Sequence, residues 1–250
     1  MHVLILGGVG EARELATVLA ARPGVRVTLS LAGRTRSPIL ADCEVRVGGF
    51  GGAAGLADWL RTHEVNVLVD ATHPFARVIS RNAAGAAATI GVPMVVLERP
   101  PWAAIPGDCW ARVNDMDAAV AALGPNERRV FLAVGRQEVA AFRAAPQHHY
   151  VIRSIEPVVP EAMPPKAETI LARGPFAAAG EQALFLAHGI DVVVAKNSGG
   201  PATYGKIAAA RKLRLPVVIV DREPRAGAAL TVGEAVDQFD HLAISPKRGV

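Results

Sequence analysis

Cysteine and aromatic residues are scarce in this chain of 250 residues. The only two cysteines, Cys43 and Cys109, lie far apart and in no spacing typical of a metal site, so we expect free thiols and no bound metal. Aromatic residues make up 5% of the chain, whereas half of it is apolar and rich in alanine, valine and glycine. This composition is typical of helices packed on a buried parallel sheet.

Dense runs of positive charge and long apolar segments are also missing. The net charge is +4, but its lysines and arginines are scattered, which favours an anionic small molecule over nucleic acid as the partner. The most apolar long stretch, Ala83 to Leu97, contains Gly91-Val92-Pro93 and is too short to span a bilayer. No signal-peptide pattern precedes the first apolar run. We therefore expect a cytoplasmic protein that binds neither nucleic acid nor membrane.

Apolar runs typical of strands alternate with helical patterns along the chain, which predicts an α/β fold with parallel sheets. A break at Arg99-Pro100-Pro101-Trp102, with Pro106-Gly107 soon after, predicts a linker between two halves with a cleft between them. In the first half we expect strands at 2–6, 25–31, 43–47, 65–70 and 93–98, and helices at 10–21, 52–62 and 75–91. In the second we expect strands at 129–134, 149–153, 169–172, 191–195 and 216–220, and helices at 115–123, 136–144, 176–188, 204–214 and 231–241.

The first apolar run breaks into a glycine-rich turn where a helix is expected to begin. Gly7-Gly8-Val9-Gly10-Glu11-Ala12-Arg13 follows directly on residues 1–6. A strand, a glycine turn and a helix N-terminus cradle phosphate, because the backbone can approach the ligand and the helix offers free N–H groups. The match to G-x-G-x-x-G is incomplete, since Arg13 stands where the last glycine belongs when the pattern starts at Gly8. Arg13 is either a ligand for a phosphate or carboxylate, or an ordinary surface residue.

The second strand leads into Ser30-Leu31-Ala32-Gly33-Arg34-Thr35-Arg36. A domain selective for NAD places an acid here to bind the ribose hydroxyls, whereas a small hydroxyl residue and arginines favour the extra phosphate of NADP. No acid lies between Thr28 and Arg36, so the sequence favours NADPH/NADP. Arg34 is the first candidate for that phosphate and Arg36 the second, with solvated loop arginines as the alternative.

Polar residues also follow the other expected strands. Thr72 and His73 come after Asp70, and His73 is either a proton donor or a helix cap. Four glycines within residues 48–52 either admit a ligand or form a flexible turn. In the second half, arginines follow three strands, which suggests an electropositive site for a polyanion: Arg136, Arg153 and Arg173.

The segment Lys196-Asn197-Ser198-Gly199-Gly200 carries the densest chemistry, with Tyr204 just beyond it. Lys196 can bind a carboxylate or donate a proton. Ser198 and the glycine N–H groups can form an anion nest. The order of residues differs from G-x-x-x-x-G-K-[ST], so this is not a Walker loop.

Together these segments resemble the precorrin-6A reductase family, also called precorrin-6x reductase, of the cobalamin pathway. The resemblance covers nearly the whole chain and rests on Gly7-Gly8-x-x-Glu11-Ala12-Arg13, Ser30-x-Ala32-Gly33-Arg34, Asp70-Ala71-Thr72-His73-Pro74-Phe75, Arg173-Gly174-Pro175-Phe176 and Lys196-Asn197-Ser198-Gly199-Gly200. It implies NADPH-dependent reduction of one ring double bond of precorrin-6A, giving precorrin-6B, and some members use the cobalt-containing analogue. Val9 departs from the family, whose members tend to have Thr or Ser there, so backbone N–H groups would have to hold the phosphate.

The resemblance also implies two Rossmann-like domains, of which residues 1–99 bind NADP and residues 100–250 bind the substrate. The expected cofactor residues are Gly7, Gly8, Val9, Gly10, Glu11, Ser30, Gly33, Arg34 and Thr72. The expected substrate residues are Arg13, Arg136, Arg153, Arg173, Lys196, Asn197, Ser198, Gly199, Gly200 and Tyr204. Lys196 is the first candidate for the catalytic proton donor and His73 the second.

For any of these functions we expect a monomer or a small homo-oligomer. Two alternatives to the reductase function stay open. One is an NADP-dependent oxidoreductase of the short-chain type, although the usual Tyr-x-x-x-Lys pair is missing: Ala208 stands four residues after Tyr204, and Ser154 four after Tyr150. The other is a non-catalytic sensor of a dinucleotide or anionic metabolite, which gives no reason for Lys196 at a strand end.

Overall fold

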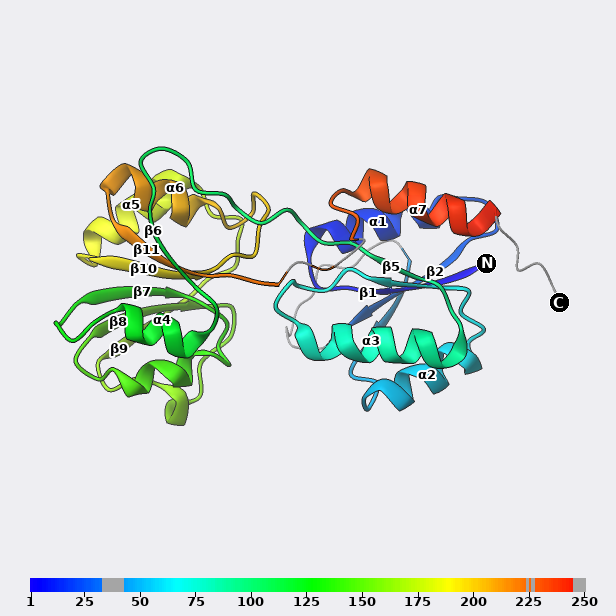
Figure 1. Ribbon diagram of the computed structural model, residues 1–250, viewed down its shortest axis with the longest axis horizontal. Helices are drawn as coiled ribbons and strands as arrows, with labels where there is room; N and C mark the ends of the chain where they lie inside the picture. The colour runs from blue at the N-terminus through cyan, green and yellow to red at the C-terminus, as the bar shows by residue number, and fades with distance from the viewer. Residues whose placement is uncertain (33–42, 224, 226–227, 245–250) are drawn as a thin grey trace. The chain divides into compact units, whose positions relative to one another are not determined.

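The computed structural model describes residues 1–32, 43–223, 225 and 228–244 (Figure 1). The chain divides into two compact units, one made of Met1–Arg99 with Pro224–Val250 and the other of Pro100–Glu223. Each unit has its own sheet, and all strand pairs named in both sheets are parallel. The predicted α/β class with two parallel sheets is therefore confirmed.

The sheet of the first unit has the order β3-β2-β1-β4-β5. The chain moves outward from β1 to β3 and then returns to β4 on the other side, so the strand order reverses between β1 and β4. In open α/β sheets, ligands bind at the carboxyl ends of strands beside such a reversal. The elements are β1 (His2–Leu6), α1 (Gly10–Ala20), β2 (Arg26–Leu31), β3 (Glu44–Val47), α2 (Ala53–Thr62), β4 (Val67–Asp70), α3 (Arg77–Ile90), β5 (Met94–Val96) and α7 (Val232–Ile244).

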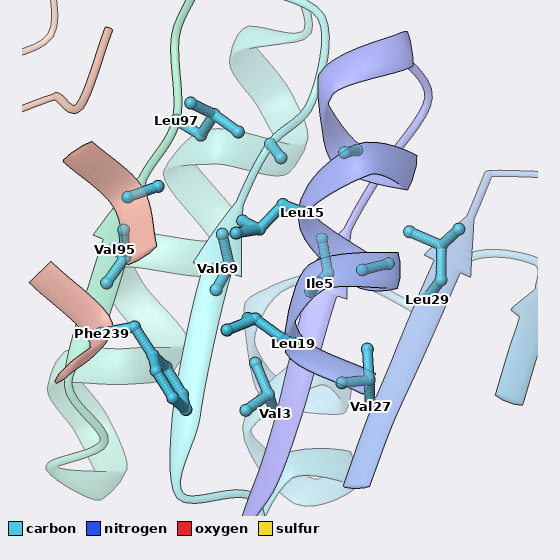
Figure 2. Packing of buried hydrophobic residues seen from close by; sticks show 14 of the residues in the cluster. Val3, Ile5, Leu15, Leu19, Val27, Leu29, Val69, Val95, Leu97 and Phe239 are labelled. Carbon is cyan, nitrogen blue, oxygen red and sulfur yellow. The ribbon is translucent and has the colours of Figure 1, made fainter. Parts of the chain in front are cut away.

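Strand β1 is buried on both faces because its side chains alternate between two helix layers. Val3 and Ile5 share one apolar cluster with α1 and α7, and Leu4 and Leu6 share another with α2 and α3. Figure 2 shows the first cluster, in which Leu15 and Leu19 of α1 lie over the sheet. This packing fixes the carboxyl end of β1, where the glycine turn begins.

The last helix, α7, completes the first unit and not the second. Phe239 of α7 is 2% exposed and packs in the same cluster as Val95 of β5 (Figure 2). Just before the helix, Ala229 forms a parallel bridge with Leu97. The expectation that residues 100–250 form one domain is therefore corrected: the second unit ends at Glu223. The physical reason is that α7 packs beside α1 and buries apolar surface of β5.

The sheet of the second unit has the order β6-β11-β10-β7-β8-β9, with β7 and β10 adjacent at its centre. From β7 the chain continues to one edge, and from β10 it continues toward the other, so this sheet also reverses its order between two central strands. The elements are β6 (Cys109–Val113), α4 (Met116–Ala122), β7 (Arg129–Ala133), a 3₁₀ helix (Val139–Ala144), β8 (His149–Ser154), a second 3₁₀ helix (Pro160–Ala162), β9 (Ala167–Leu171), α5 (Ala178–Ala187), β10 (Val192–Lys196), α6 (Gly205–Leu213) and β11 (Pro216–Val220).

Two details of this unit differ from the sequence-based expectation. Strand β6 was not predicted, because its residues at the sheet edge are mostly exposed and lack an apolar run. The helix expected at 136–144 is a 3₁₀ helix over Val139–Ala144. Within the described residues, we find no helix that is long and apolar enough to cross a membrane.

Candidate functional site

The glycine turn of the first unit allows the protein backbone to come close to a ligand. A Cβ on Gly7 would lie 2.6 Å from Leu29 Cδ1, so the neighbouring strand leaves no space for a side chain there. Gly8 has a φ of +143°, which side chains rarely adopt. Helix α1 starts at Gly10, and its N-cap residue Val9 makes no side-chain capping bond. The first-turn N–H groups of α1 are thus available to an anion.

Two charged residues of α1 lie beside this turn. The guanidinium Nη2 of Arg13 is 3.9 Å from the position of a Cβ on Gly10, so Arg13 folds back toward the start of its own helix. Arg13 is half-buried, and within the described part of the chain no carboxylate is paired with it. Glu11 faces Arg99, with 3.6 Å between Oε1 and Nε. Arg13 therefore adds positive charge to the turn, while Arg99 offsets the charge of Glu11.

At the carboxyl end of β2, the structure adds an arginine that sequence reasoning missed. Arg46 is the register partner of Ser30, and its Nη1 lies 3.4 Å from Ser30 Oγ. Arg46 also donates to the carbonyls of Gly48 and Gly49, at 2.6 and 2.7 Å, and its guanidinium stacks 3.7 Å from the ring centre of Phe50. Burial lowers the pKa of Arg46. The expected residues Gly33, Arg34 and Arg36 lie outside the described residues.

At the end of β4, the polar residues contact one another. Asp70 is 1% exposed and accepts hydrogen bonds from Thr72 N and Oγ1, at 3.1 and 2.7 Å, and from Arg225 Nη1 at 2.8 Å. Arg225 also faces the buried Glu98, with 3.6 Å between Nε and Oε1. His73 Nδ1 accepts from the backbone N–H of Phe75 at 3.2 Å, as a turn-capping histidine does. Glu98 and Arg225 were not anticipated, because the contacts of Arg225 with Glu98 and with Asp70 span 127 and 155 residues of sequence.

In the second unit, β10 and β7 are the two central strands of the sheet. Lys196 is the last residue of β10, and Gly135 lies just after β7. Lys196 Nζ lies 2.8 Å from Glu138 Oε1. A Cβ on Gly135 would lie 2.3 Å from Glu138 Oε2 and 3.3 Å from Lys196 Nζ, so the ion pair sits directly over this glycine. The side chains of Lys196 and Glu138 are 13% and 29% exposed, so both remain accessible at the strand ends. Sequence reasoning selected Lys196 but not Glu138.

The residues after Lys196 are buried as far as Gly199, and Gly200 is partly exposed. Asn197 is fully buried and exchanges two hydrogen bonds with the backbone of Trp102, at 2.7 and 3.1 Å, and a third with Asp221 at 3.2 Å. Its amide is thus occupied inside the fold. The Ser198 N–H bonds back to the Lys196 carbonyl at 2.8 Å. Gly199 and Gly200 follow in the left-handed region, with φ of +68° and +72°.

Trp102 links this segment to Tyr204. The indole N–H of Trp102 donates to the Gly200 carbonyl at 2.8 Å, and its ring centre is 5.7 Å from that of Tyr204. The Tyr204 hydroxyl accepts a hydrogen bond from Arg211 at 2.6 Å. Tyr204 therefore packs against Trp102, which holds the loop at Gly200 in place.

The three arginines at strand ends of this unit differ in their surroundings. Arg153 is buried, pairs with the buried Glu181, and stacks 3.6 Å from the ring centre of Phe176. Arg136 and Arg173 are exposed. The arrangement brings Lys196 and Arg136 to the ends of adjacent central strands, whereas Arg153 supports the residues around it.

A family model described as Precorrin-6x reductase CbiJ/CobK matches residues 2–242. The chain belongs to this family. Its precorrin-6A reductase relative from Sinorhizobium sp. is 53% identical over 97% of this chain and 92% of its own length, and that from Rhodococcus erythropolis is 51% identical over 93% and 94%. A solved structure titled CobK precorrin-6A reductase superimposes with a TM-score of 0.91 at 43% identity, covering all of both chains. As a precorrin-6x reductase, the protein is an oxidoreductase, which decides against a non-catalytic sensor.

Proposed function

We propose that the protein reduces one ring C=C bond of precorrin-6A to give precorrin-6B in cobalamin biosynthesis, with NADPH as the reductant. The observation that carries this proposal is the similarity, over nearly the full chain, to relatives named precorrin-6A reductase at up to 53% identity. The polar strand ends of both units support it, since the reaction needs a phosphate cradle for the cofactor and cations for a polycarboxylate substrate.

The glycine turn fits the pyrophosphate of a dinucleotide. Gly7 leaves no space for a Cβ, α1 lacks a side-chain cap, and Arg13 folds back beside Gly10 without a carboxylate partner among the described residues. The N–H groups of residues 8–11 would hold the phosphates, with Arg13 as an additional cation. NADPH, when bound, supplies the hydride.

Preference for NADPH over NADH would come from the end of β2. There, Ser30 offers a hydroxyl, and Arg46 is a half-buried cation bound by carbonyl oxygens and, within the described part of the chain, by no carboxylate. An arginine near this point is how such folds accommodate a 2′-phosphate. We propose Arg46, together with Arg34 from the segment that follows β2 in the sequence, for this role.

The second unit would hold the substrate carboxylates and supply the proton. We propose that Lys196 Nζ donates the proton to the carbon next to the one that receives the hydride, or orients a carboxylate there, with His73 as the second candidate donor. The exposed Arg136 and Arg173, the Ser198 hydroxyl and the N–H groups of Gly199 and Gly200 are proposed as carboxylate ligands. For Arg153, Asn197 and Tyr204 the proposed role is to support these ligands, because their polar groups are engaged inside the unit.

Anaerobic assays with purified protein test this function. NADPH oxidation, followed by absorbance, should depend on precorrin-6A, and mass spectrometry should show a product that has gained two hydrogens. Lys196→Ala should lower kcat by about 10²- to 10⁴-fold if Lys196 is the proton donor. Lys196→Arg separates the two roles, because it keeps the charge but donates a proton poorly.

The matched control for these variants is Lys212→Ala, an exposed residue in the last turn of α6, which should retain wild-type rates. No NADPH oxidation by the wild-type protein with precorrin-6A would overturn the proposed function. Wild-type kcat and KM in Lys196→Ala would instead remove only the assignment of Lys196.

A further inference from the structure

The Lys196–Glu138 ion pair joins the two points where a ligand of the second unit is expected. Lys196 ends β10, and Glu138 follows β7, the strand beside it in the sheet. The two residues are 58 positions apart in sequence, and their charged atoms are 2.8 Å apart. The pair is partly exposed, so a ligand can reach the ammonium while the carboxylate holds it.

The backbone around Glu138 fixes where its carboxylate lies. The Glu138 N–H donates to the Gly135 carbonyl at 2.9 Å, which closes a tight turn at the end of β7. The 3₁₀ helix begins immediately after Glu138, and its Val139 and Phe142 are fully buried. With its backbone held in this turn, Glu138 presents its carboxylate as a defined partner for the Lys196 ammonium.

Gly135 makes the geometry of the pair possible. Any side chain at this position would meet Glu138 Oε2 at 2.3 Å and Lys196 Nζ at 3.3 Å. Gly135 does not have a positive φ, in contrast to Gly199 and Gly200, so backbone conformation does not explain its presence. The space that the ion pair needs explains why a glycine stands at position 135.

We propose that Glu138 is a positioning residue for Lys196, and that Gly135 provides the space in which the two side chains meet. A lysine side chain has a flexible four-carbon stem and a point charge, so without a fixed partner its ammonium samples many positions. Held by Glu138, the ammonium stays directed at one place at the strand ends. This inference rests on the proposed role of Lys196 in the reduction.

Chemical labelling tests the positioning in the absence of substrate and cofactor. Full-length protein is treated with a limiting amount of an acetylating reagent, and acetylation of each lysine is quantified by peptide mass spectrometry. In Glu138→Ala, labelling of Lys196 should rise severalfold over wild type, while labelling of Lys212 and Lys166 stays unchanged. Glu161→Ala, an exposed glutamate of the same unit, is the matched control and should leave Lys196 as in wild type. Equal labelling of Lys196 in wild type and Glu138→Ala would overturn the proposal.

Steady-state kinetics then test whether the positioning serves the reaction. Glu138→Ala should lower kcat by about ten- to a hundredfold with the KM for NADPH unchanged, because misplacing a reacting group carries such a penalty. In the Lys196→Ala background, the same change should have no further effect on kcat, since the group it positions is gone. Losses that multiply in the double variant would show a general structural role and contradict the inference. Glu138→Gln, which keeps a hydrogen-bond acceptor without the charge, should fall between wild type and Glu138→Ala.

Gly135→Ala provides an independent route to the same disruption. The added methyl group should push Glu138 away from Lys196 and reproduce both the labelling and the kcat effects of Glu138→Ala. Gly180→Ala is its control, because a Cβ on Gly180 meets no atom within 4 Å. Normal Lys196 labelling and kcat in Gly135→Ala would refute the role of this glycine. A wild-type protein inactive on precorrin-6A would refute the proposed function. The labelling experiment would still test whether Glu138 positions Lys196, because it uses neither substrate nor cofactor.

Discussion

Truncating Phe239 to alanine tests whether the C-terminal helix is an integral part of the first unit. The ring is 2% exposed, packs with Val95 and Val69 of the sheet, and has the Arg22 guanidinium 5.7 Å from its centre. Removing such a buried ring leaves a cavity and costs about 3–5 kcal/mol in phenylalanine-to-alanine substitutions. Because every 1.4 kcal/mol is about tenfold in an equilibrium constant, amide protection in the affected unit should fall by about 100- to 4,000-fold.

Hydrogen exchange measured by mass spectrometry is the suitable assay, since a single melting temperature is not well defined for a chain with two units. Peptides from β1, β4 and β5 should exchange faster in Phe239→Ala, and peptides from β7 and β10 should not. Leu242→Ala on the same helix is the control: Leu242 is 36% exposed, so its loss should change stability by no more than about 0.5 kcal/mol. Slowly exchanging peptides of the second unit that lose as much protection as those of the first would refute the assignment of α7.

Three further predictions concern two residues proposed to bind the cofactor and one buried histidine. Gly7→Ala should destabilise the protein by about 1–3 kcal/mol through overpacking against Leu29 and weaken NADPH binding in a fluorescence titration, whereas Gly49→Ala, with open space around its Cβ, should do neither. Arg46→Ala should lose about 1.5–3 kcal/mol of NADPH affinity and leave NADH affinity unchanged, and equal losses for both would contradict a 2′-phosphate contact. Burial lowers the pKa of His148 below its usual 6.5, so the unfolded chain binds more protons there and stability is lost as the pH falls below about 6.5. Urea midpoints at pH 7.5 and 5.5 should differ less in His148→Leu than in wild type, and an identical difference in both proteins would exclude His148 as a source.

The elements that could be predicted from sequence are those whose burial is written into local patterns. Residues 2–6 form a continuous apolar run, and the structure buries all of them in β1. Strand β6 contains Cys109-Trp110-Ala111-Arg112-Val113 and lies at a sheet edge with only partial burial, so its sequence carries no comparable signal. The helical pattern of α7 was recognised, but its partner was not, because the cluster that receives Phe239 is formed by residues from the other end of the chain.

The candidate site follows the same division between local and distant information. The glycine turn and Lys196 were recognisable because each comes directly after an apolar strand. Their partners were not: Glu138 is 58 residues from Lys196, and Arg225 is 155 residues from Asp70. The strand order brings Lys196 beside Glu138, and the return of the chain to the first unit after β11 brings Arg225 beside Asp70, so both contacts depend on the whole fold.

The polar residues at the strand ends differ in burial, and residue type alone does not separate the buried ones from the accessible ones. Asn197 and Asp70 are buried, and their polar atoms bond to other parts of the same unit. Lys196 and Arg13, in contrast, keep part of their charged surface accessible beside glycine turns. A polar group that must meet a ligand at a fixed point needs buried polar neighbours whose own positions are determined by packing. Each accessible ligand candidate should therefore depend on a supporting residue whose backbone is fixed by packing, as we propose that Lys196 depends on Glu138, and loss of the support should lower turnover more than it lowers stability.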